Sequence, residues 1–253
     1  MAALLSINPQ NPIEKAKRKR YIENNEKKNK SGSFVLSGPK IISKPQDPVS
    51  KLVVFLHGYG SSGDDLIGLA EFWEHFLPST IFISPNGPEK CDTYPIGYQW
   101  YGIPDFTPAN MRLGLDRIRP VLTEYLKSLL IQYKLSPQDL ALIGFSQGGI
   151  VALEMLFSLP NINSIISYSG AFFPPTEKPT VQTSTNVMLV HGNMDTVVPY
   201  SAFFQAEQDL KSLGINVTSH TCPNIGHTID TDGIHTGGHF LKQTLSGSKP
   251  RDL

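Results

Sequence analysis

Short apolar runs alternate with longer amphipathic segments along most of the chain. The run KLVVFLH at 51–57 is almost continuously apolar, as expected for a strand that is buried on both faces of a sheet. The segment 64–77 spaces its apolar side chains three and four residues apart, which predicts an amphipathic helix. The same reasoning predicts further strands at 80–84, 139–145, 164–169, 187–192 and 216–222, and further helices at about 110–133, 147–159, 200–213 and 232–245.

Repeated strand–helix alternation predicts an α/β fold, with a mostly parallel central sheet and helices on both faces. The length of 253 residues suits one sizeable core. We therefore expect one domain at 34–245, followed by a short tail at 246–253. In sheets of this kind ligands lie at the carboxyl ends of the strands. The Pro- and Gly-rich segment 85–108 is too long for a simple connection, so we expect a functional loop there.

Residues 1–33 are predicted to form a basic, disordered extension. They contain few large apolar side chains, and residues 1–34 hold eight Lys and Arg against three Glu. Such a segment buries too little surface to offset the entropy lost on ordering. The run KAKRKR leaves nucleic-acid binding or nuclear import open as an alternative, although a solvated tail is the interpretation that we favour.

Composition excludes several classes of protein. The formal net charge is zero, which provides no overall attraction to nucleic acid or to an anionic membrane. No apolar run approaches the roughly 18 residues of a membrane span, and the N-terminus does not resemble a signal peptide. Cys91 and Cys222 lack the spacing of a metal or redox motif. We therefore expect a cytoplasmic protein with reduced thiols, no nucleic-acid partner and no stable membrane insertion.

The segment LALIGFSQGG contains the most informative motif. It places Gly144-Phe-Ser146-Gln-Gly148 between a predicted strand and a predicted helix, which is the setting of a nucleophile elbow. A turn this sharp strains its central residue, brings backbone close to both glycines and projects the serine hydroxyl above the sheet. Alternatively, Ser146 only caps the helix that follows a glycine-rich turn. The flanking strand and helix favour a nucleophile.

A serine nucleophile needs a general base, and in this kind of fold an acid and then a histidine follow the serine in the chain. Asp195 follows the strand 187–192, and His227 follows the strand 216–222. We expect the adjacent Gly226 to let the loop bend. On its own, Asp195 could equally be a turn residue or a helix N-cap. The agreement of all three positions with the required order is the strongest argument for a triad.

The rival acids and bases fit this order less well. Asp230 and Asp232 follow His227 and suit a cap of the last helix. His191 lies at a strand end, where we expect it to support the Asp195 loop through hydrogen bonds.

The remaining candidates fail on their context. His75 precedes the nucleophile, His220 lies inside a strand, and Cys222 has no elbow around it. His235 and His239 have the spacing of two metal ligands on a helix, but HTGGH lacks the Glu of H-E-x-x-H and contains two helix-weakening glycines. We expect no metal there.

The motif HGYGSSG at 57–63 has two interpretations. Its glycine spacing matches a dinucleotide-binding loop, but no acidic residue stands near the end of the next strand to bind a ribose. An ester hydrolase instead needs one backbone N–H from this loop and one from the residue after the nucleophile. Those donors are the N–H groups of Tyr59 and Gln147. We favour this second interpretation, an oxyanion loop.

The segments FLHGYGSSGDDLIGLA, QWYGI, IGFSQGGIVAL, HGNMDTVVP and IGHTID together closely resemble the phospholipase/carboxylesterase family. This is a compact α/β-hydrolase group that includes bacterial carboxylesterases and acyl-protein thioesterases. The resemblance implies an α/β-hydrolase fold without a large lid domain. It also implies Ser146, Asp195 and His227 as the triad, with Tyr59 and Gln147 as oxyanion donors.

The resemblance extends over about 34–245. It implies that Trp100, in QWYGI, belongs to the wall of the substrate pocket, for which ordinary core packing is the alternative. Two parts of the chain depart from the family pattern. The basic extension at 1–33 has no counterpart in it, and the loop 85–108 varies within the family, which leaves substrate choice open.

The expected function is therefore that of a serine carboxylesterase acting on small carboxylic esters or thioesters through an acyl-enzyme, without cofactor or metal. A lysophospholipase or acyl-protein thioesterase acting on long acyl chains is the alternative within enzymes. A non-catalytic binding module on the same fold is a more remote one. The sequence leaves a homodimer open.

Overall fold

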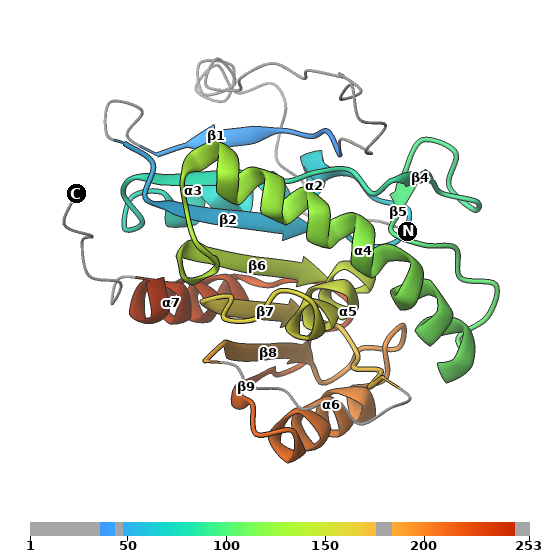
Figure 1. Cartoon of the computed structure of the whole chain (residues 1–253). Coiled ribbons are helices and arrows are strands. Elements are labelled where there is room, and N and C mark those ends of the chain that lie inside the picture. The colour runs from blue at the N-terminus through green and yellow to red at the C-terminus, as the bar shows by residue number, and fades with distance from the viewer. Residues whose placement is uncertain (1–35, 44–47, 176–183, 246–253) are drawn as a thin grey trace, which may run out of the picture.

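The computed structural model describes residues 36–43, 48–175 and 184–245. A seven-stranded sheet forms its centre, with the strand order β1-β3-β2-β6-β7-β8-β9 (Figure 1). Neighbouring strands pair in parallel except for β1, which runs antiparallel to β3 at one edge. The strands are β1 (Lys40–Ile42), β2 (Lys51–Leu56), β3 (Thr80–Ile83), β6 (Leu140–Phe145), β7 (Ser164–Tyr168), β8 (Asn186–Gly192) and β9 (Asn216–Cys222).

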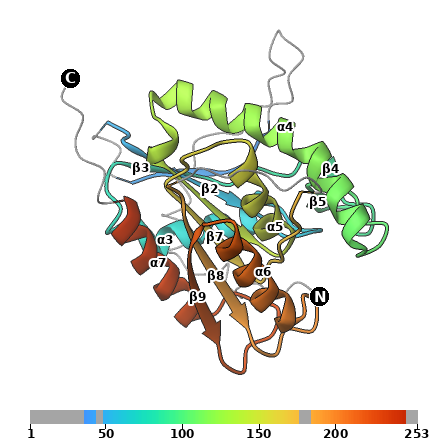
Figure 2. The same cartoon turned by 60° about the horizontal axis from the view of Figure 1, so that its bottom comes forward.

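Helices cover both faces of the sheet (Figures 1 and 2). Alternate residues of β2 point to opposite faces, as the geometry of a strand requires. Leu52 and Val54 pack into one buried cluster, whereas Val53 and Phe55 pack into the other. The first cluster lies under α4 (Pro108–Tyr133), α5 (Gln147–Glu154) and α6 (Tyr200–Ser212), and the second lies under α2 (Gly63–Ile67), α3 (Leu69–Trp73) and α7 (Thr231–Leu245).

The predicted α/β architecture is confirmed, with differences in detail. The helix expected at 64–77 is two short helices, α2 and α3, because the N–H of Gly68 bonds to the carbonyl of Leu66 instead of continuing the helical ladder. The helix expected at 147–159 ends at Glu154 and continues as the 3-10 turn η3 (Met155–Phe157).

Three short strands and one 3-10 turn lie in segments where no regular structure was expected. The loop 85–108 contains the hairpin of β4 (Glu89–Lys90) and β5 (Tyr98–Gln99), and β1 extends the sheet beyond β3. A 3-10 turn, η2 (Pro137–Asp139), leads into β6.

No helix in the described part of the chain is long and apolar enough to cross a membrane. The predicted extension at 1–33 and the tail at 246–253 lie outside the described residues.

A buried ion pair joins α4 to α5, the helix that begins directly after Ser146. The Glu154 side chain is 1% exposed and accepts two hydrogen bonds from the Arg112 guanidinium, at 2.6 and 2.8 Å, and one from Arg119. Arg112 also donates to the carbonyl of Phe173 at 2.9 Å. The pair therefore fixes the C-terminal end of α5 against α4 and the segment at Phe173.

We predict that Glu154→Ala lowers the free energy of unfolding by about 3–5 kcal/mol, because it leaves a largely buried guanidinium without its carboxylate. Urea unfolding followed by circular dichroism measures the change. Glu124→Ala is the control, since Glu124 forms an exposed pair with Lys127. Its replacement should lower the free energy of unfolding by less than about 1 kcal/mol. A loss below about 1 kcal/mol for Glu154→Ala would contradict the role given to the pair.

Candidate active site

Ser146 occupies the sharp turn between β6 and α5. Its backbone has φ 54° and ψ −118°, an unusual conformation for a residue with a Cβ. The flanking glycines are required by the packing: a Cβ on Gly144 would lie 2.1 Å from the carbonyl oxygen of Gly148, and a Cβ on Gly148 would lie 1.8 Å from that of Leu56. The strained elbow predicted from the sequence is therefore present, with Ser146 half-buried at the carboxyl end of β6.

The structure brings the three residues of the candidate triad (Ser146, His227 and Asp195) into one chain of hydrogen bonds. The Oγ of Ser146 lies 3.0 Å from Nε2 of His227, and Nδ1 of His227 lies 2.8 Å from Oδ2 of Asp195. Phe145 packs against the imidazole of His227, with 4.8 Å between ring centroids. The three side chains, which are far apart in sequence, thus have the arrangement that a nucleophile, its general base and an orienting acid require.

The hydrogen bonds around Asp195 favour its ionised form. Burial acts to raise the pKa of this carboxyl, but the hydrogen bond from His227 and those from the backbone N–H groups of Val198 and Val197 outweigh it, so the pKa lies below its ordinary value. An ionised Asp195 accepts the Nδ1–H of His227. This assigns the tautomer whose Nε2 lone pair faces Ser146, as a general base requires.

His191 supports the Asp195 loop, as expected. Its Nε2 lies 2.9 Å from the carbonyl of Val198 and 3.4 Å from Oδ2 of Asp195. Burial lowers the pKa of His191, so this imidazole is neutral at neutral pH and donates its hydrogen to the loop carbonyl.

The expected oxyanion loop lies against Ser146. A Cβ on Gly58 would lie 3.5 Å from the Cβ of Ser146, so the backbone of this loop passes directly beside the elbow. Among the described residues, the N–H groups of Tyr59 and Gln147 have no backbone acceptor. The loop itself is fixed from the far side, because Gly60, at φ 76°, donates to the carbonyl of Tyr98 at 2.9 Å.

Sequence reasoning missed the supports behind this loop. His57 is fully buried; its Nε2 accepts from the N–H of Gly87 at 2.8 Å, which leaves Nδ1 to donate to the carbonyl of Gly58 at 2.8 Å. The Gln147 side chain bridges to the next segment, since its Oε1 accepts from the N–H of Trp100 at 3.0 Å and its Nε2 donates to the carbonyl of Tyr101 at 2.7 Å. The signal for His57 was its place at a strand end directly before a glycine.

Trp100 lies beneath the loop and is 1% exposed. Its indole N–H donates to the carbonyl of His57 at 2.8 Å, and its ring lies 5.2 Å from the imidazole, centroid to centroid. In this state Trp100 packs as a core residue that holds the loop. Its contact with a bound substrate stays a prediction.

Comparison with known proteins is consistent with this geometry. A sequence model of the Phospholipase/Carboxylesterase family matches residues 37–245. The chain belongs to this family. Its fold is the α/β-hydrolase fold: the crystal structure of esterase PE8 superimposes with a TM-score of 0.77 at 38% identity, covering 84% of this chain and all of PE8.

Curated relatives cover nearly the same part of this phospholipase/carboxylesterase family member. Esterase YpfH of Escherichia coli (strain K12) is 28% identical over 222 residues, which are 84% of this chain and 94% of YpfH. Acyl-protein thioesterase 1 of Saccharomyces cerevisiae is 28% identical over 227 residues, which are 83% of this chain and 100% of the thioesterase. Both names describe ester or thioester hydrolysis by proteins of similar length.

The rival residues have other surroundings. Asp230 accepts a hydrogen bond from the N–H of Gly233 at 2.8 Å and thereby caps α7, as predicted. Asp232 lies in the first turn of α7 and contacts His220 instead. Burial and the neighbouring carboxylate of Asp230 raise the pKa of Cys222 to about 12, so this thiol is protonated and a poor nucleophile at neutral pH.

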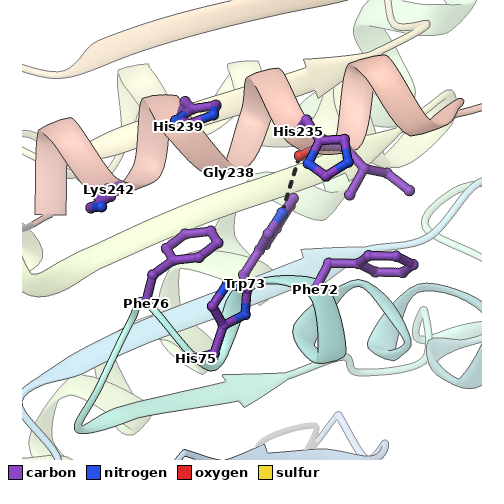
Figure 3. A pocket seen from close by; sticks show the side chains of 9 residues that line it. Phe72, Trp73, His75, Phe76, His235, Gly238, His239 and Lys242 are labelled. Atoms are coloured by element: carbon purple, nitrogen blue, oxygen red, sulfur yellow. Dashed lines mark hydrogen bonds between the residues drawn. The ribbon is translucent and has the colours of Figure 1, made fainter.

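A cavity of about 330 Å³ lies between α3 and α7 (Figure 3), and no residue of the candidate triad is among those that line it. Trp73 lines it and donates its indole N–H to the carbonyl of Ile234 at 3.1 Å. His75, His235 and His239 belong to its lining, but their imidazoles do not converge on one point in Figure 3. The i, i+4 histidine pair of HTGGH therefore lies at the edge of an aromatic cavity.

Buried His57 makes the fold sensitive to acid. Burial lowers its pKa from 6.5 to about 4, so the folded state disfavours the proton that the unfolded state takes up below about pH 6.5. Burial of neutral His57 therefore costs no stability above about pH 6.5, and the folded state loses stability relative to the unfolded state as the pH falls from 6.5 towards 4. We predict that His57 alone lowers the free energy of unfolding by about 2 kcal/mol between about pH 7 and pH 4.5.

Urea unfolding at the two pH values, for the wild type and His57→Gln, measures this contribution. The glutamine does not titrate, so the pH dependence should flatten by about that amount even though the variant is less stable overall. Equal pH dependence in both proteins would show that His57 is not the group responsible.

Proposed function

We propose that this protein is a serine hydrolase that cleaves carboxylic esters or thioesters through an acyl-enzyme on Ser146. The observation that carries the proposal is the continuous hydrogen-bonded chain from Ser146 through His227 to Asp195. Membership of the phospholipase/carboxylesterase family supports the same reaction class.

Acylation follows from the tautomer assigned to His227. As the Oγ of Ser146 attacks the substrate carbonyl carbon, Nε2 of His227 takes the hydroxyl proton, and the carbonyl oxygen becomes an oxyanion. The N–H groups of Tyr59 and Gln147 are the proposed donors to that oxyanion, where each is worth about 10²–10³ in rate. The tetrahedral intermediate then expels the alcohol or thiol, which receives the proton from His227.

Deacylation repeats these steps with water. His227 takes a proton from the water molecule as its oxygen attacks the acyl carbon, and it returns that proton to Oγ of Ser146 when the carboxylic acid leaves. Asp195 keeps Nδ1 protonated throughout and stabilises the imidazolium. Each half-reaction balances with water as the co-substrate, and no cofactor enters it.

The length of the acyl chain separates the two candidate activities. Small soluble esters are the first proposal. Long-chain acyl thioesters are the alternative, and the similarity to acyl-protein thioesterase 1 of yeast supports it. The test is steady-state hydrolysis of p-nitrophenyl esters from acetate to palmitate by the full chain. An optimum at short chains supports a carboxylesterase, a rise towards palmitate supports the long-chain alternative, and inertness on every ester would contradict the proposed reaction.

We assign catalysis to residues 34–245 and place the protein in the cytoplasm, where its two free cysteines would stay reduced. We predict that deleting residues 1–33 leaves kcat/KM for a soluble ester within about twofold, because every residue of the candidate triad and both oxyanion donors lie outside this segment. Parallel kinetics of the full and shortened proteins measure the effect. A loss of tenfold or more would mean that the extension is part of the folded site.

A further inference from the structure

The end of β9 and the first turn of α7 bring three metal-binding side chains together. Within the described ranges, His220, Cys222 and Asp232 offer one ligand atom each, and these atoms all lie within 4.8 Å of one another. The Nε2 of His220 lies 2.8 Å from Oδ2 of Asp232. We call these three residues the β9–α7 cluster.

The arrangement follows from two rigid elements. His220 and Cys222 are two residues apart on a strand, so their side chains point to the same face, where α7 packs. Asp232 projects from the first turn of that helix. This set combines two residues of a strand with one residue of a helix that begins after an intervening loop, and its spacing matches none of the common metal-binding motifs.

Imidazole, thiolate and carboxylate are the ligand types that Zn²⁺ uses in proteins. Tetrahedral coordination at the usual bond lengths separates ligand atoms by about 3.3–3.8 Å. The wider separations in the cluster therefore need to contract by about 1.5 Å or less, and the 2.8 Å between His220 and Asp232 needs to widen by about 0.5 Å. Side-chain rotation can provide both changes. His220 and Asp232 have side chains that are 27% and 60% exposed, so an ion and a coordinated water can reach the site from solvent.

We propose that His220, Cys222 and Asp232 bind one divalent ion of the Zn²⁺ class through Nε2, Sγ and a carboxylate oxygen, with water as the fourth ligand. The thiol loses its proton to solvent as the S–metal bond forms, and His220 binds as the neutral tautomer that carries its hydrogen on Nδ1. Asp230, whose carboxylate lies beside the thiol, disfavours the thiolate in the free protein, and the positive charge of the bound ion has to offset this repulsion.

The site would connect the two ends of the segment that carries His227. Cys222 is the last residue of β9, Asp232 belongs to the first turn of α7, and His227 lies between them. An ion that joins these ends stabilises the folded state, because the unfolded chain does not hold the three ligands in one fixed geometry. The proposal stands independently of the reaction assigned to Ser146.

All seven histidines and both cysteines of the chain lie within the described residues, so the other histidines and the other cysteine that could bind the ion can be named. Cys91 is the other thiol, and it is buried. His235 and His239 form the other candidate pair, at the cavity between α3 and α7 (Figure 3). These residues provide matched controls for a metal titration.

The test is a Co²⁺ and Zn²⁺ titration of the tag-free full chain, by absorption and by calorimetry. We expect one ion per chain, a thiolate-to-Co²⁺ charge-transfer band in the near ultraviolet, and a rise of roughly 5 °C in Tm at saturating Zn²⁺. Cys222→Ser should remove the band. Asp232→Asn, at an exposed position that does not threaten folding, should weaken Zn²⁺ binding about 10–100-fold, whereas Cys91→Ser and His239→Asn should bind as the wild type does.

Three results would overturn the proposal. The first is the absence of stoichiometric binding at tens of micromolar Zn²⁺, which would leave His220 and Asp232 as a hydrogen-bonded pair at the start of α7. The second is binding that Asp232→Asn and Cys222→Ser both leave unchanged. The third is binding that His239→Asn abolishes, which would place the ion at the α3–α7 cavity.

Discussion

Replacing Ser146 with Ala is expected to lower kcat on p-nitrophenyl acetate about a millionfold, which leaves only the rate given by substrate binding and the oxyanion donors. Without Oγ, His227 has no proton to take and no acyl-enzyme forms. The substitution should not disturb the elbow, because Ala and Ser both carry a Cβ and face the same strain at φ 54°. Steady-state kinetics with circular dichroism measure both effects.

Ser201→Ala is the control for this prediction. Ser201 is exposed in the first turn of α6, so its loss should leave kcat within about twofold. A Ser146→Ala protein that folds normally and loses less than a hundredfold would contradict the role of Ser146 as nucleophile.

Replacing Asp195 with Asn is expected to lower kcat/KM about 10⁴-fold, through the tautomer of His227. Oδ1 of Asp195 accepts from the N–H groups of Val197 and Val198, so the amide oxygen of Asn will occupy that position and its NH₂ will face His227. Nδ1 must then accept a hydrogen bond, which moves the imidazole proton to Nε2. An Nε2 that carries a proton cannot take one from Ser146.

Asp230→Asn is the matched control, because Asp230 is the rival carboxylate on the His227 side of the site. Asn is also a good helix cap, so the bond to the N–H of Gly233 can persist and activity should change less than about threefold. Similar losses in both variants would mean that Asp195 has no special relation to His227. An Asp195→Asn loss below about tenfold would contradict the mechanism outright.

The strands and the order of the candidate triad were predictable from the sequence for physical reasons. A strand such as β2, which is buried on both faces, must be apolar almost throughout, and this leaves an unambiguous pattern. The elbow was predictable because Gly144 and Gly148 have no room for a Cβ, so the geometry constrains the residue types directly. The positions of Asp195 and His227 could then be predicted, because the acid and the histidine follow the serine along the chain, each after a later strand.

Other features depend on contacts that no local pattern records. The glycine that the His227 loop requires is Gly192, where a Cβ would lie 2.3 Å from the carbonyl oxygen of Ile225; Gly226 has ample room, so the expected reason for its presence was wrong. The edge strand β1 has only three residues and is held by its pairing with β3. The meeting of His220 with Asp232 depends on how α7 returns to β9.

Labelling with a fluorophosphonate, followed by intact-protein and peptide mass spectrometry, tests whether Ser146 is an activated nucleophile. The reagent captures a serine only where a neighbouring base and an oxyanion site activate it. We expect one adduct per chain, located on the peptide that contains Ser146 and absent from Ser146→Ala. No adduct on the folded wild type would contradict the proposed mechanism and point to a non-catalytic protein on a hydrolase fold, and an equal adduct on Ser146→Ala would show that another residue is the nucleophile.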